Sequence, residues 1–139
     1  MTTMRFDLDR AMQVLARTPG ALRTLLSGLD DAWLHGNYGE ATFSPFDVVG
    51  HLITGERIDW MGRIRRILES GVSRPFDVYD RYAQFERSSG RDIEPLLTEF
   101  ARLRDSNVAA LRELKLSPAD LSKRGLHPVL GEVTLDQVM

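Results

Sequence analysis

The chain has no cysteine, and this absence excludes two kinds of chemistry. Without cysteine it can form no disulfide framework, and it has no thiolate of its own for catalysis or metal binding. Segments long and apolar enough to cross a membrane are also missing. We expect no signal peptide, because Arg5, Asp7, Asp9 and Arg10 interrupt any apolar run near the N-terminus. These features are typical of a cytoplasmic protein.

The chain has little net charge, −2 over 139 residues, and this argues against nonspecific binding to nucleic acid. Its one short basic cluster, Arg63-Ile64-Arg65-Arg66, favours a solvated helix face over a phosphate site. We therefore expect neither a nucleic-acid partner nor a membrane partner. The length suits a single domain over residues 1–139 that can bury a hydrophobic core.

Alternating apolar residues, which indicate strands, are almost absent, whereas helical spacings of three and four residues are common. The first helix is expected over residues 6–17. We expect it to restart with Thr18 as a cap and to kink at Pro19, because proline has no N–H to donate. Residues 30–42 are expected to form a loop.

The second helix is expected over residues 45–69, with clear signals at both ends. Ser44 suits the N-cap, Pro45 suits the first helical position and Gly71 suits the C-cap. A continuous apolar stripe along this helix predicts the seam of a helical bundle. We call these residues the seam: Phe46, Val49, Ile53, Trp60, Ile64 and Ile67.

A third helix is expected over residues 93–114, capped by Asp92. Residues 70–91 are expected to be irregular, with a single turn near residues 82–86, and residues 125–132 to form a loop. Tyr79, Asp80 and Tyr82 in the irregular segment could line a pocket entrance, and the sequence does not decide whether they do. Three long amphipathic helices without strands predict an all-α up-and-down bundle.

The C-terminal segment predicts the start of a further helix. Thr134 and Gln137 have the spacing of a capping box, and only Val138 and Met139 follow them. We therefore expect a fourth helix that this chain leaves incomplete. A bundle without its fourth helix would expose part of the seam, so we also expect the chain to form a homodimer.

His51 is the residue most capable of chemistry on the second helix. It shares one helical face with Asp47, Gly55, Ile58 and Gly62. Two glycines beside a histidine leave room for a ligand or for another backbone. A core histidine hydrogen-bonded to a neighbour explains the same pattern, and one histidine alone is not a metal site.

Three other titratable residues have mainly structural interpretations. Glu56 lies on the seam, where a buried carboxylate needs a partner such as Arg102 or Arg104. His35 is expected at the surface. His127 could lie at the mouth of the bundle, although a plain loop role fits it better.

The order of several short motifs resembles that of DinB-like proteins. The motifs are Thr18-Pro19 followed by leucines, then residues 44–52 leading to Glu56, then His127-Pro128, and finally residues 131–135. The resemblance spans essentially the whole chain. It implies a metal-binding four-helix bundle related to bacterial thiol-dependent transferases and to maleylpyruvate isomerase.

The same resemblance implies a metal site. In this family His51 would be the first ligand, and a His-x-x-x-His pair on the last helix would supply the other two. Here that helix would begin at Thr134, and the chain ends before such a pair. The intact protein would hold nickel, zinc or iron, and this chain would not bind it tightly. The implied activity is thiol transfer or hydrolysis of a small molecule, with a low-molecular-weight thiol as one candidate substrate. A non-catalytic helical module that binds a ligand or partner is the alternative.

Overall fold

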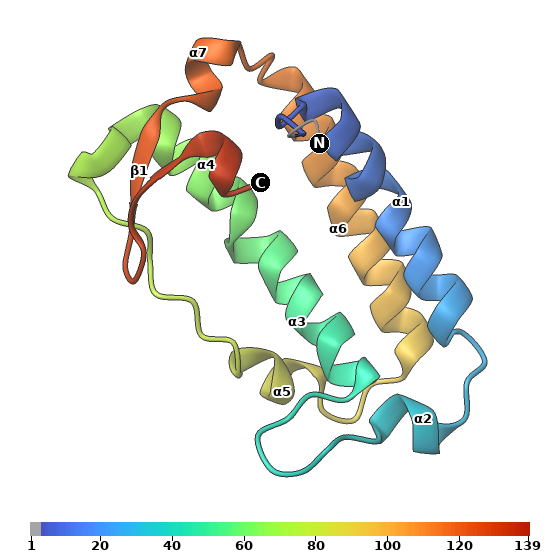
Figure 1. Cartoon of the computed structure of the whole chain (residues 1–139). Coiled ribbons are helices and arrows are strands. Elements are labelled where there is room, and N and C mark those ends of the chain that lie inside the picture. Colours follow the sequence, from blue (N-terminus) through green and yellow to red (C-terminus); the bar gives the residue numbers. More distant parts are fainter. Residues whose placement is uncertain (1–3) are drawn as a thin grey trace.

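The computed structural model describes residues 4–139 as long helices packed side by side, with a β-hairpin at one end (Figure 1). The long elements are α1 (Leu8–Leu26), α3 (Pro45–Ile58), α4 (Trp60–Ser70) and α6 (Ile93–Glu113). Short helices connect them: α2 (Asp31–His35), α5 (Ala83–Ser88) and α7 (Pro118–Leu121). The strands are β1 (Arg124–His127) and β2 (Gly131–Thr134), and single 3-10 turns are η1 (Gly71–Ser73) and η2 (Leu135–Gln137).

Helix α1 is continuous through Pro19, so the predicted restart at Thr18 was wrong. The Thr18 hydroxyl does not cap a new helix but donates to the Val14 carbonyl, one turn earlier, at 2.9 Å. Pro19 cannot donate to the Leu15 carbonyl, as a residue in a helix interior normally would. That carbonyl accepts a hydrogen bond from Nη1 of Arg104 on α6 instead, at 3.0 Å. A side chain from a neighbouring helix thus replaces the bond that proline removes.

The predicted second helix forms as α3 and α4, which a local distortion at Asp59 separates. Ser44 caps α3 as expected, and it forms a reciprocal capping box with Asp47. The helical hydrogen bonding continues across Asp59, whose N–H donates to the Gly55 carbonyl at 3.0 Å. Gly71 ends α4 with a φ of 55°, the left-handed conformation that glycine adopts easily.

Each of the three predicted loops contains regular structure. Residues 30–42 contain α2, and residues 70–91 contain η1 and α5, of which α5 is the single turn predicted near residues 82–86. Residues 125–132, expected as a loop, lie within an antiparallel hairpin in which β1 pairs with β2. The hairpin is built by tertiary contacts, because a Cβ at Gly125 would lie 2.6 Å from Ile67 and 2.8 Å from Phe76. Only glycine lets this strand approach α4 so closely.

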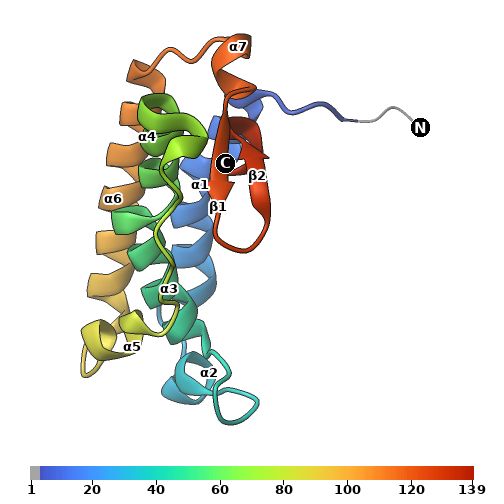
Figure 2. The same cartoon turned by 90° about the vertical axis from the view of Figure 1, so that its left-hand side faces the viewer.

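The path of the chain includes one long return connection. Figures 1 and 2 show that α3–α4 and α6 run in the same direction, whereas α1 runs opposite to both. The segment from η1 to α5 therefore passes back along the length of the bundle before α6 begins. The predicted helical bundle is confirmed. Its path is up-and-down from α1 to α3, whereas α3–α4 and α6 are parallel because the return connection joins them. None of the helices in residues 4–139 is long and apolar enough to cross a membrane.

The core consists of two apolar clusters, one toward each end of the bundle. The cluster near α2 contains Leu26, Leu34, Phe46, Val49, Ile53, Leu96, Leu97 and Phe100. The cluster near the hairpin contains Met12, Met61, Ile64, Ile67, Phe76, Leu111, Val133 and Leu135. Every seam residue except the half-buried Trp60 is thus buried within a single chain. The predicted capping box of Thr134 is present, and it opens η2, which places Leu135 in this core.

A polar bridge connects α3 with α6 where the two clusters meet. Nε of Arg104 donates to Oε1 of Glu56 at 2.5 Å, and these side chains are 8% and 1% exposed. The Asn107 amide donates to Oε2 of Glu56 at 2.9 Å and to its backbone carbonyl at 2.8 Å. The expected buried ion pair of Glu56 is therefore present, with Arg104 and not Arg102 as its partner.

Candidate functional site

The face of α3–α4 that carries His51 is open within the part of the chain that the structure describes. His51 and Gly55 are half-buried, whereas Ile58 and Gly62 are exposed. A Cβ added at Gly55 or at Gly62 would meet no atom within 4 Å. The sequence predicted that these glycines make room beside His51, and the structure confirms the room.

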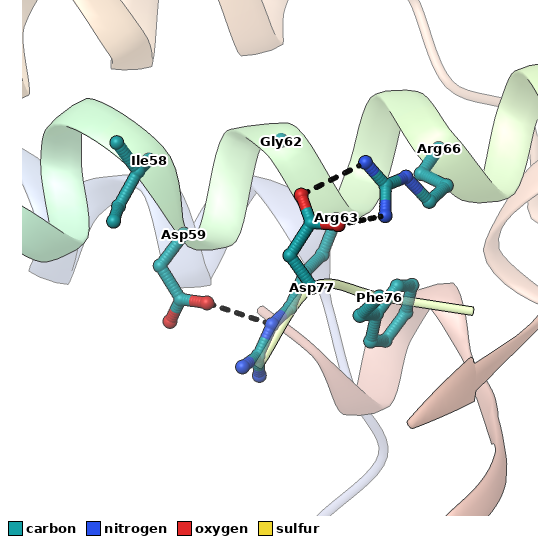
Figure 3. A pocket seen from close by; sticks show the side chains of 7 residues that line it. All are labelled: Ile58, Asp59, Gly62, Arg63, Arg66, Phe76 and Asp77. Carbon is teal, nitrogen blue, oxygen red and sulfur yellow. Dashed lines mark hydrogen bonds and ion pairs between the residues drawn. The ribbon is translucent and has the colours of Figure 1, made fainter. Parts of the chain in front are cut away.

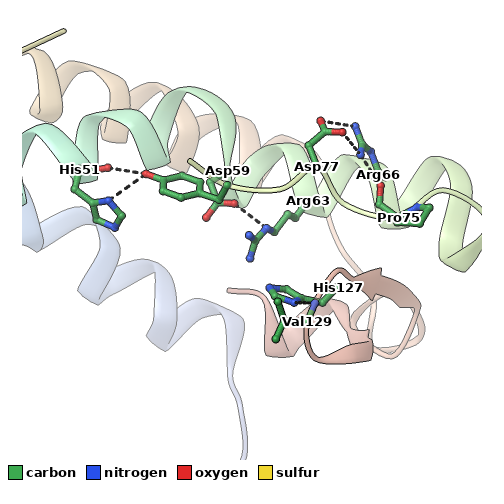
Figure 4. A network of polar contacts seen from close by, with 9 residues as sticks. His51, Asp59, Arg63, Arg66, Pro75, Asp77, His127 and Val129 are labelled. Carbon is green, nitrogen blue, oxygen red and sulfur yellow. Dashed lines mark hydrogen bonds and ion pairs between the residues drawn. The ribbon is translucent and has the colours of Figure 1, made fainter. Parts of the chain in front are cut away.

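The His51 ring lies between two aromatic side chains. Tyr79, from the return segment before α5, packs edge-on at 5.3 Å between ring centroids with an interplanar angle of 81°. Phe43, just before α3, lies 5.6 Å away at 59°. The Tyr79 hydroxyl lies 3.3 Å from Nδ1 of His51 and 3.1 Å from its backbone carbonyl (Figure 4). One edge of the imidazole is therefore engaged, and no hydrogen bond to the other edge is present among the described residues.

A charged pair lies two turns farther along the same face. Nε of Arg63 and Oδ1 of Asp59 are 2.7 Å apart (Figures 3 and 4). Burial raises the pKa of the Asp59 carboxyl, whereas Arg63, His127 and His51 partly offset this effect. Burial and the charge of Asp59 together raise the pKa of Tyr79 to about 12, so its phenol keeps its proton at neutral pH. Figure 4 shows His51, Asp59, Arg63 and His127 in one region beside α3–α4.

The return segment is anchored beside this region by Arg66 of α4. Its guanidinium donates to the Pro75 carbonyl at 2.7 Å and to both carboxylate oxygens of Asp77 at 3.1 Å. This pairing lowers the pKa of Asp77. Two of the arginines in the basic cluster, Arg63 and Arg66, are therefore engaged in ion pairs. Residues of both pairs line a small cavity of about 60 Å³ between α4 and the return segment, and Figure 3 shows how these side chains lie around it.

His127 has a structural role in the hairpin turn. Its Nδ1 accepts hydrogen bonds from the backbone N–H groups of Val129 and Leu130, both at 3.1 Å. A neutral imidazole that accepts at Nδ1 carries its proton on Nε2, so in this state it offers no free lone pair to a metal. His35 is exposed at the end of α2 and packs its ring 4.7 Å from Phe46.

A broader apolar groove lies on the α2 side of His51. It encloses about 480 Å³ between α2 and the start of α3, and Trp33, Tyr38, Phe43 and Val48 are among the side chains that line it. Phe43 connects this groove with the imidazole, because it lines the groove and also packs against His51. A small apolar group bound there would therefore lie beside the candidate site.

The sequence pointed to His51 and offered Tyr79 only as a residue that could line a pocket entrance, and it did not single out Asp59 and Arg63 as a pair beside His51. The only available signals were the eight-residue separation of His51 and Asp59, about two helical turns, and the i, i+4 spacing of Asp59 and Arg63. Tyr79 could not be placed beside His51 in this way, because it comes from an irregular segment whose path depends on the whole fold.

The model of the DinB superfamily matches residues 15–139. The chain belongs to the DinB superfamily. Its fold is also similar to that of YfiT from Bacillus subtilis, described as a probable metal-dependent hydrolase with an unusual four-helix bundle topology. That match has a TM-score of 0.78 at 22% sequence identity, and it covers 98% of this chain and 79% of YfiT. No match was found among curated proteins. The family resemblance and the four-helix bundle fold that the sequence predicted are thus confirmed for this DinB-superfamily chain.

Proposed function

We propose that this DinB-superfamily chain belongs to a metal-dependent enzyme that acts on a small molecule, as a hydrolase or a thiol transferase. His51 is the proposed metal ligand, and nickel, zinc and iron are the candidate metals. The observation that carries this proposal is the half-buried imidazole on an open helical face, with Nε2 free of hydrogen bonds among residues 4–139. The description of YfiT as a probable metal-dependent hydrolase supports the reaction class.

The residues described here do not form a complete metal site. No group of three or more His, Cys, Asp or Glu side chains in residues 4–139 is placed to hold a metal ion. His51 offers one nitrogen, whereas catalytic zinc sites use three protein ligands. The proposed site therefore needs ligands from outside these residues, such as histidines beyond the present C-terminus. We expect this chain alone to hold such a metal only weakly.

The chain's own residues suggest how a substrate would be held. The groove at Trp33, Tyr38 and Phe43 would take an apolar part of the substrate. Arg63 lies on the other side of His51 along α3–α4, where it could attract a negatively charged group, although its pairing with Asp59 would then have to loosen. A small molecule with an apolar part and an anionic part fits this arrangement.

A non-catalytic ligand-binding module is the second candidate. The groove of about 480 Å³ favours it, because that volume suits a small ligand without any metal. The two candidates make different predictions for a variant at His51. The enzyme needs His51 for catalysis, whereas a binding module would still bind its ligand in the groove without it.

The proposal is tested by assaying ester hydrolysis and thiol transfer with excess nickel, zinc or ferrous iron, with and without a chelator. Turnover should require the metal, should disappear in His51→Ala and should persist in His35→Ala, the matched exposed histidine. Turnover that survives the chelator or the His51→Ala substitution would contradict the proposal. Ligand binding in the groove without any turnover would favour the binding module.

We also propose that the chain forms a homodimer, although the surface first expected for the contact is not available. The seam is buried within one chain, so a dimer would use other exposed apolar side chains. Ile58, 56% exposed on the face of His51, and Trp33, 72% exposed at the groove, are two such side chains.

A further inference from the structure

We propose that Tyr79 is a positioning residue that fixes the tautomer of His51. It places the ring proton on Nδ1 and leaves the lone pair of Nε2 directed away from the return segment. The significance of this tautomer for metal binding rests on the function proposed above, whereas the tautomer itself does not depend on any metal.

The assignment follows from counting protons. A phenol has one proton to donate, and the Tyr79 hydroxyl lies within hydrogen-bond distance of two groups on His51. The backbone carbonyl can only accept, and it is the closer group, at 3.1 Å against 3.3 Å for Nδ1. If the phenol donates to the carbonyl, the second contact is a hydrogen bond only when Nδ1 carries a proton and donates to the phenol oxygen. The proton on Nδ1 is therefore the arrangement that satisfies both contacts.

The environment keeps the phenol and the imidazole in this relation. Phe43 and Tyr79 pack against the His51 ring, which restricts its rotation. Three residues before Tyr79, the buried Phe76 donates its backbone N–H to the Leu126 carbonyl at 3.0 Å. Arg66 fixes the same stretch through its bonds to Pro75 and Asp77. Tyr79 thus projects from a segment held at several points, of which Figure 4 shows the bonds from Arg66 to Pro75 and Asp77. Such support is what a positioning residue requires.

A hydrogen bond at one imidazole nitrogen determines which tautomer the other nitrogen presents. Partners of this kind orient metal-binding histidines in many proteins, and their loss typically lowers metal affinity about 10- to 100-fold. Tyr79 would serve His51 in the same way, by presenting Nε2 as an electron-pair donor toward the open face at Gly55 and Gly62.

The proposal is tested by nitrogen NMR of the histidine side chains in the metal-free chain, at a pH well above the ordinary histidine pKa of about 6.5. In the wild type, His51 should show a protonated Nδ1 and a non-protonated Nε2. Tyr79→Phe keeps the aromatic ring and removes only the hydroxyl, so His51 should shift toward a mixture of the two tautomers. Tyr82→Phe is the matched control, because the Tyr82 hydroxyl accepts a hydrogen bond from Arg81 and lies outside the His51 contacts. It should leave the His51 signals unchanged.

Three results would overturn the proposal: a protonated Nε2 in the wild type, unchanged His51 signals in Tyr79→Phe, or an equal change in Tyr82→Phe. The wild-type spectrum decides the assignment even if Tyr79→Phe folds poorly, which circular dichroism would reveal. Failure of every metal to reach His51 would remove the function proposed above and leave the tautomer assignment intact. The opposite result is metal binding at His51 together with an Nδ1 that stays protonated in Tyr79→Phe. It would remove the proposed role of Tyr79 and leave the function proposed above intact.

Discussion

Arg104→Leu is expected to destabilise the chain strongly, because Arg104 serves two partners in the middle of the bundle. It neutralises the buried carboxylate of Glu56, and it supplies the hydrogen bond that Pro19 denies to the Leu15 carbonyl. Leucine can do neither. The substitution leaves a carboxylate with Asn107 as its one remaining partner among the described residues, together with a carbonyl that has lost its bond to Arg104.

The size of the loss can be worked from these two contacts. Removing one partner of a buried ion pair typically costs about 3–5 kcal/mol. The unpaired carbonyl adds about 1 kcal/mol. We therefore expect Arg104→Leu to lower the free energy of unfolding by about 4 kcal/mol at pH 7.

Urea unfolding followed by circular dichroism measures this loss, and the chain offers two further variants as checks. Arg102→Leu removes an exposed arginine two residues earlier on α6, and it should change the stability by less than about 0.5 kcal/mol. Adding Pro19→Ala to Arg104→Leu should recover about 1 kcal/mol or more, because alanine can donate to the Leu15 carbonyl again. A loss below about 1 kcal/mol for Arg104→Leu at pH 7, or an equal loss for Arg102→Leu, would refute this account of the polar bridge.

Three further predictions concern other parts of the molecule. Gly50→Ala should destabilise by about 1–3 kcal/mol, because the new Cβ would lie 2.5 Å from Ser88 of α5. Gly55→Ala on the same helix meets open space and should stabilise by about 0.5–1 kcal/mol; equal effects in urea unfolding would contradict both. Hydrogen bonds from Arg57 and Arg91 lower the pKa of Glu99 in the folded chain. Its contribution to the free energy of unfolding should therefore be fully present above its unfolded pKa, near 4.5, and should be lost as the pH falls through the lower folded pKa. Glu99→Gln should therefore cost about 1 kcal/mol at pH 7 and progressively less as the pH falls below 4.5, and a pH-independent cost would contradict this. Sedimentation at micromolar concentration should show a homodimer, and a monomer at every concentration would exclude it.

Local signals predicted the start of α3 and the buried face of α3–α4 well. Ser44 and Pro45 predicted the start of α3, and the spacing of the seam predicted which side of α3–α4 is buried. These features depend on residues within a few turns of one another. Capping hydrogen bonds and helical periodicity need no knowledge of the rest of the chain.

Features that depend on distant contacts could not be predicted in this way. Thr18 and Pro19 predicted a new helix, whereas α1 continues because Arg104, 85 positions after Pro19, supplies the missing hydrogen bond. The hairpin was missed because Gly125 has low strand propensity and forms part of β1 through its close approach to α4. The position of Tyr79 beside His51 depends on the return segment, whose path no local pattern indicates. The sequence therefore identified the candidate ligand and offered Tyr79 as a residue that could line a pocket, but it could not place Tyr79 beside His51.

The central claim is that His51 binds a divalent metal through Nε2, and a zinc titration followed by nitrogen NMR of the three histidines tests it most directly. We predict that zinc in excess shifts Nε2 of His51 at a lower concentration than it shifts either nitrogen of His35 or His127. The first transition should be absent in His51→Ala and preserved in His35→Ala. A response of all three histidines at the same zinc concentration, or an unchanged first transition in His51→Ala, would contradict the claim.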